Sequence, residues 1–70
     1  MERYFVEFNY KCILLENKEL RGDNICMYFS CENEEDIKMN IEKYLLEDIL
    51  LCFDVKDLTI DIINIDKMEE

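Results

Sequence analysis

Residues 3–15 read RYFVEFNYKCILL, and this stretch decides the fold. Its apolar side chains recur at every second position, with charged or polar residues between most of them. The alternating set is Tyr4, Val6, Phe8, Tyr10, Cys12 and Leu14. Alternation of this kind is typical of a strand that buries one face. Because the stretch is long and strongly apolar, we expect it to be the central strand of a sheet.

The chain has one glycine, Gly22, and no proline. The sequence Gly22-Asp23-Asn24 favours a turn, and residues 24–31 alternate again after it, which predicts a second strand. An antiparallel hairpin with this turn fixes a register in which four apolar pairs share one face. The pairs are Leu14 with Ile25, Cys12 with Met27, Tyr10 with Phe29, and Phe8 with Cys31.

A helix is predicted over about residues 34–51. Asn33 is a good N-cap residue, and acidic residues follow it where the helix dipole favours them. Apolar residues then recur at helical spacing. This stripe consists of Ile37, Ile41, Tyr44, Leu45, Ile49 and Cys52, whereas Met39, Leu46 and Leu50 lie off it.

Residues 57–65 are rich in β-branched side chains and alternate, which predicts a third strand. The order ββαβ, with a right-handed crossover, favours one α+β domain over residues 1–70. We expect a three-stranded mixed or antiparallel sheet of order 2-1-3 with the helix on one face. The hydrophobic content of 50% is too high for a disordered acidic chain.

This arrangement leaves the second face of the sheet uncovered. Its expected apolar residues are Phe5, Ile13, Tyr28 and Ile63. One interpretation is that they are scattered hydrophobic residues on a small monomer. The other is that they form a contact surface for a second copy or another protein, because exposed apolar patches tend to be interfaces.

The charge of the chain is −10, and residues 32–70 carry thirteen acids and four bases, a net of −9. Such a field repels nucleic acid and anionic membranes and attracts basic surfaces. One interpretation is a solvated face that keeps the protein in solution. The other is an acidic face that docks on a Lys- and Arg-lined groove. Its predicted residues are Glu34, Glu35, Asp36, Glu42, Glu47, Asp48, Asp54 and Asp57.

No catalytic motif is present. The chain has no histidine, its single serine and threonine are Ser30 and Thr59, and no glycine-rich loop is available for phosphate. A zinc site would need all four cysteines, yet the alternation places Cys26 on the face opposite Cys12, Cys31 and Cys52. We therefore expect a non-enzymatic protein without metal or cofactor, with three buried thiols. An intermolecular disulfide through Cys26 is the alternative role for the fourth.

The start of the chain lacks the features of a secretory signal, and no apolar run is long enough to span a bilayer, so we expect a cytoplasmic protein. In size, acidity and expected layout the chain resembles the anti-CRISPR proteins, small phage-encoded inhibitors of bacterial defence nucleases. The resemblance involves no specific residues. It implies an inhibitor that mimics nucleic acid on a nuclease complex in the host cytoplasm. The alternative is a homo-oligomeric structural or regulatory subunit that acts through the open sheet face.

Overall fold

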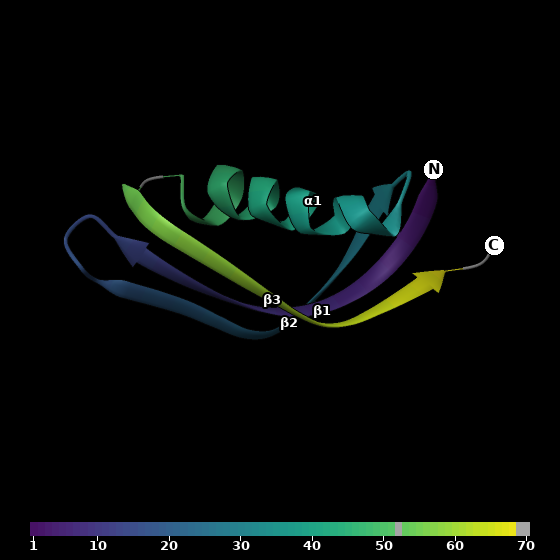
Figure 1. The fold of residues 1–70 in the computed structure, drawn as a ribbon, viewed down its shortest axis with the longest axis horizontal. Helices are drawn as coiled ribbons and strands as arrows, with labels where there is room; N and C mark the ends of the chain where they lie inside the picture. Colours follow the sequence, from purple (N-terminus) through teal and green to yellow (C-terminus); the bar gives the residue numbers. More distant parts are fainter. Residues whose placement is uncertain (52, 69–70) are drawn as a thin grey trace.

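The computed structural model describes residues 1–51 and 53–68, with the backbone alone at Ile49. The elements are β1 (Glu2–Leu14), β2 (Glu19–Cys31), a 3-10 turn (Glu34–Asp36), α1 (Ile37–Tyr44), a π-helical turn (Leu45–Ile49) and β3 (Val55–Met68). Both strand pairs are antiparallel and the sheet order is β2-β1-β3. The helix packs on one face of this sheet (Figure 1), so the predicted α+β fold is confirmed.

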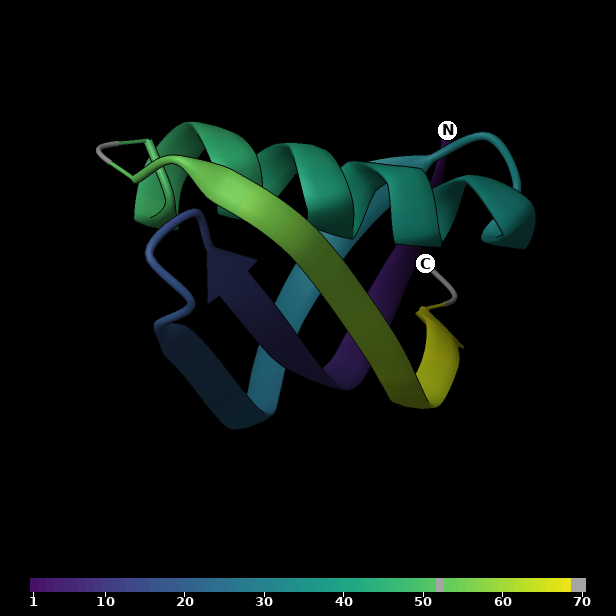
Figure 2. The ribbon, with the colours of Figure 1, turned by 60° about the vertical axis from the view of Figure 1, so that its left-hand side comes forward.

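The sheet is bent, and the helix lies across its concave side (Figures 1 and 2). The bend coincides with two irregularities in pairing near the middle of β1. The register with β2 shifts between Phe8 and Tyr10, and the register with β3 shifts between Glu7 and Phe8. A β-bulge adds a residue to one strand and bends it. The open face of the sheet is therefore convex and divided into two halves.

The core forms between the alternating face of β1 and the helix. All six alternating residues that the sequence predicts as the inner face of β1 are buried. They meet Ile37, Ile41, Leu45 and Leu50 from the helical segment and Ile60 from β3. Local period-two alternation therefore identified the inner face of the central strand correctly.

The predicted turn at residues 22–24 is wrong. The chain reverses at residues 15–18, where the N–H of Leu14 donates to the carbonyl of Lys18 and Asn17 adopts a left-handed φ of 61°. Since β2 begins at Glu19, Phe8 pairs with Ile25 instead of Cys31, a difference of six residues. Because six is even, the same side chains still face the helix despite the wrong register.

The turn-like residues form a bulge inside β2 instead. Asn24 has a φ of 53°, a conformation that asparagine tolerates better than most residues. Its backbone N–H donates to Oδ1 of Asn9 on β1 at 2.8 Å. This hydrogen bond supports the extra residue in β2 at the point where the sheet bends.

The helical segment differs from the prediction at both ends. Asn33 is extended at the expected N-cap position, but its side chain makes no capping hydrogen bond. At the other end the N–H of Leu50 donates to the carbonyl of Leu45 at 2.7 Å, which closes a π-helical turn. This wider turn carries Leu50 into the core, where it is 2% exposed, although its spacing predicted a position off the buried stripe. The predicted core position Cys52 lies outside the described residues.

Candidate binding surfaces

Seven of the eight acids predicted as a docking face are exposed, and Asp36 is half-buried. Those from Glu34 to Asp48 lie along the helical segment, and Asp54 follows it. Asp57 is separate, because it pairs with Ile13 on β1 and belongs to the sheet. We use the name acidic helix surface for Glu34, Glu35, Asp36, Glu42, Glu47 and Asp48.

The carboxylates of the acidic helix surface have no ion-pair partner among the described residues. The three ion pairs found there all join sheet or hairpin residues: Lys11 with Glu19 at 3.1 Å, Lys18 with Glu16 at 3.5 Å, and Lys67 with Glu2 at 3.4 Å. Residues 32–48 carry seven acids and two bases, Lys38 and Lys43. The helix therefore presents a net negative field that close contacts do not neutralise.

Two apolar side chains are exposed on the outside of the same helical segment. Met39 is 68% exposed and Leu46 is 38% exposed, although Ile37, Ile41 and Leu45 on the inner side are fully buried. Met39 and Leu46 line a shallow hollow of about 300 Å³ together with Glu42, Lys43 and Glu47. We call these five residues the helix crest. The signal in the sequence is that Met39 and Leu46 lie off the predicted buried stripe.

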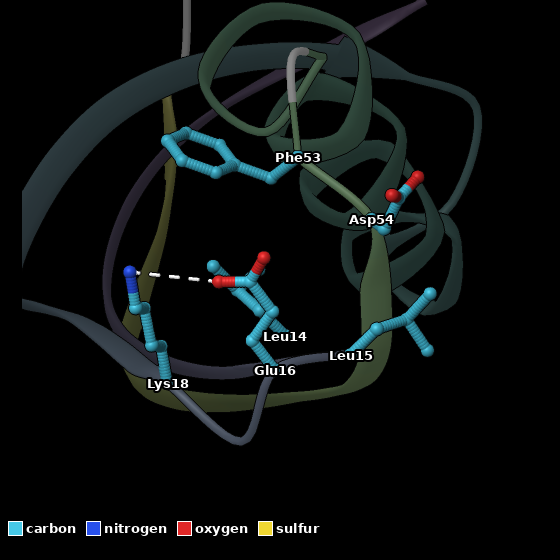
Figure 3. A pocket seen from close by; sticks show the side chains of 6 residues that line it. All are labelled: Leu14, Leu15, Glu16, Lys18, Phe53 and Asp54. Atoms are coloured by element: carbon cyan, nitrogen blue, oxygen red, sulfur yellow. Dashed lines mark ion pairs between the residues drawn. The ribbon is translucent and has the colours of Figure 1, made fainter.

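A second hollow, of about 190 Å³, lies where the hairpin turn meets the chain that leaves the helix. Its lining residues are Leu14, Leu15, Glu16, Lys18, Phe53 and Asp54. Figure 3 shows the Phe53 ring across this pocket from the Glu16–Lys18 ion pair. The N–H of Leu15 donates to the carbonyl of Asp54 at 3.0 Å and holds the two segments together. Sequence reasoning missed this pocket because its two walls are distant along the chain.

The open face contains an aromatic cluster in its first half, which is the half formed by the N-terminal part of β1, before the bend. The rings of Phe5 and Tyr28 lie 5.0 Å apart between centroids, and Cζ of Arg3 lies 5.6 Å from the centroid of Tyr28. Tyr28 is 58% exposed and Ile63 is 47% exposed. Ile13 lies eight residues along β1 from Phe5, about 26 Å at the usual rise per residue, and beyond the bend. The structure therefore brings Phe5 and Tyr28 together and places Ile13 apart from them.

For the three cysteines that the structure describes, the division into buried and exposed thiols that the alternation predicted is confirmed. Cys12 and Cys31 are buried and Cys26 is exposed. Burial raises the pKa of the Cys12 thiol, and Asp57 adds to the effect. Burial likewise raises the pKa of Cys31, with a further contribution from Asp36. These two thiols stay protonated at neutral pH, which makes them poor nucleophiles.

Comparison with known proteins identifies no relative. No family model matches the chain, and no curated protein or solved structure matches it significantly. Within residues 1–51 and 53–68, no three metal-ligating side chains come together as a potential metal site. No helix of the described residues is long and apolar enough to cross a membrane. The surfaces described above are therefore the basis for assigning a function.

Proposed function

We propose that this protein is a non-enzymatic binding protein whose acidic helix surface docks on a basic protein surface, of the kind that holds nucleic acid in a nuclease. The observation that supports this proposal is the concentration of mostly exposed carboxylates along the helical segment, without ion-pair partners in the described part of the chain. Surfaces that bind nucleic acid are lined with Lys and Arg, and carboxylates can occupy the places of phosphates.

Residues 32–48 contain many more acids than bases, so nearby positive charge does not balance their carboxylates. A small protein loses some stability when like charges are crowded together, because they repel one another. Lys38 and Lys43 are the two bases of residues 32–48, which also contain seven acids, and neither lysine lies within ion-pair distance of a carboxylate of residues 1–51 or 53–68. A complementary basic partner would relieve this repulsion and would be steered toward the helix over long range.

The test compares two variants with the same net charge. The helix variant carries Glu35→Lys, Glu42→Lys and Glu47→Lys, and the sheet variant carries Glu7→Lys, Asp23→Lys and Asp61→Lys. Each changes three acids to bases and brings the net charge from −10 to −4. Circular dichroism checks that both fold. Any difference in binding then reports the location of the charge instead of its total.

The assay is affinity capture from the native host at salt concentrations of about 0.1 M and about 0.5 M, since screening weakens contacts between exposed charges. The wild type should capture a protein that high salt or a single-stranded oligonucleotide releases. The sheet variant should retain that protein and the helix variant should lose it. Capture by the helix variant at the wild-type level would refute the proposal.

A second candidate is self-association through the first half of the open face. The Phe5–Tyr28 pair and Arg3 supply the residue types that dominate interfaces. This half also carries both signs of charge, with Arg3 and Glu7 flanking Phe5 on β1, so a second copy would find opposite charges there. Sedimentation equilibrium should show a concentration-dependent dimer that Tyr28→Glu abolishes. A wild type that stays monomeric at millimolar concentration would exclude it.

A further inference from the structure

The apolar part of the helix crest bears on how tightly a partner is held. Exposed ion pairs contribute little to affinity and act chiefly on the rate of encounter. A stable complex needs buried apolar anchors near the centre of the contact, surrounded by polar residues. Met39 and Leu46 are exposed apolar side chains on the segment that carries the acidic helix surface, and Glu42, Lys43 and Glu47 line the same hollow.

The spacing of these two residues matches another helix. They are seven residues apart, which is about 10.5 Å along a helix axis at 1.5 Å per residue. A second helix that presents apolar side chains at every third or fourth position repeats that distance over two of its own turns. Met39 also suits this role, because its flexible thioether adapts to the shape of the side chains that meet it.

The charges around the crest restrict which helix fits. Three of its five residues are charged, and two of these are the carboxylates of Glu42 and Glu47. Glu35, Asp48 and the rest of the acidic helix surface extend the negative field in both directions. A second copy of this chain would bring the same carboxylates and would be repelled. An acceptable partner helix has Lys or Arg on both sides of its apolar stripe.

We infer that the helix crest is a docking groove for a cationic amphipathic helix of the partner protein. The inference rests on the proposed function and narrows its partner from any basic surface to a helix with an apolar stripe between basic flanks. The apolar side chains of that helix pack on Met39 and Leu46. Its basic residues pair with Glu42 and Glu47 at the border of the groove.

Two synthetic peptides of identical composition test the inference. Both contain about 18 residues of Lys and Leu; one places Leu at helical spacing so that it forms an apolar stripe, and the other scatters the same residues. Fluorescence anisotropy measures the binding of each peptide to the full chain at fixed salt. The patterned peptide should bind at least about fivefold more tightly, because only it buries apolar surface on the crest. A smaller difference overturns the inference.

Matched variants locate the binding. The crest variant, Met39→Ser with Leu46→Ser, should weaken binding of the patterned peptide at least about fivefold and leave the scattered peptide unchanged. The control, Ile63→Ser with Met68→Ser, removes two exposed apolar side chains from β3 and should have no effect. The inference is overturned if the patterned peptide still binds the crest variant as tightly as the wild type, or if it no longer binds the control variant.

The same measurements also distinguish a failure of this inference from a failure of the proposed function. If both peptides bind equally and the helix charge variant abolishes both, the groove is overturned and the acidic helix surface remains a docking site. If the helix charge variant binds both peptides as well as the wild type does, the proposed function fails as well.

Discussion

Replacing Gly22 by alanine tests why the glycine lies inside a strand. Gly22 pairs with Tyr10 across the sheet, and the Tyr10 side chain is 9% exposed. A Cβ atom at Gly22 would collide with Cε1 of Tyr10 and lie 2.8 Å from its Cδ1 and 2.7 Å from Cδ1 of Ile25. The φ of Gly22 is not positive, so the requirement is for space and not for an unusual backbone conformation.

The size of the effect follows from this crowding. Forcing extra methyl groups into a packed region typically costs about 1–3 kcal/mol. At roughly 0.05–0.15 kcal/mol per residue, a chain of 70 residues has a total free energy of unfolding of about 3.5–10 kcal/mol. Gly22→Ala should therefore remove a large part of the stability. At about 4–8 °C per kcal/mol for a domain of this size, the Tm should fall by at least about 4 °C.

Urea and thermal unfolding, followed by circular dichroism, measure the change. A double-mutant cycle with Tyr10→Leu isolates the ring: the cost of Gly22→Ala should fall by more than half when the ring is absent. The reasoning is refuted if Gly22→Ala is as stable as the wild type, or if its cost is the same in both backgrounds.

Three further predictions follow from hydrogen bonding and burial. Asn9→Ala removes the acceptor for the N–H of Asn24 and should lower the free energy of unfolding by about 1 kcal/mol in urea titration, whereas Asn64→Ala, which removes an exposed contact to Asp66, should cost less. The folded-state pKa values of Cys12 and Cys31 are raised, so their contribution to stability is present below the ordinary thiol pKa of 9.0 and is lost as the pH rises through the folded-state values. In urea titrations from neutral to alkaline pH, the free energy of unfolding should therefore fall more steeply for the wild type than for the Cys12→Ala, Cys31→Ala double variant. Equal slopes would contradict this prediction. In a Cys52→Ser background, iodoacetamide should alkylate Cys26 before Cys12 and Cys31, as read by mass spectrometry, and equal rates would contradict the burial of the latter two.

The sites were only partly predictable. The sequence locates the acids and predicts a strand that begins at about Asp57, but it does not show that Asp57 pairs with Ile13 and so lies apart from the acids of the helical segment. Both hollows were missed for different reasons. The crest requires knowing that Met39 and Leu46 point away from the core, and the pocket requires knowing that Leu15 is hydrogen-bonded to Asp54, far along the chain.

The sequence by itself determined the elements, their order and the inner face of the central strand. It could do so because alternation and helical spacing are local, and each residue of β1 alternates sides whatever its partners are. The sequence also determined the concentration of acids in the second half, since charge does not depend on folding.

Only the tertiary structure decided the register, the bulges and the π-helical turn. Gly22-Asp23-Asn24 suits a turn and a bulge equally well on local grounds. The choice depends on Tyr10 covering Gly22 and on Asn9 accepting from Asn24, which are contacts between strands. Leu50 likewise reaches the core because burying it against the sheet favours a wider turn over a regular one. In each case, contacts between segments distant in the chain outweigh the local preference.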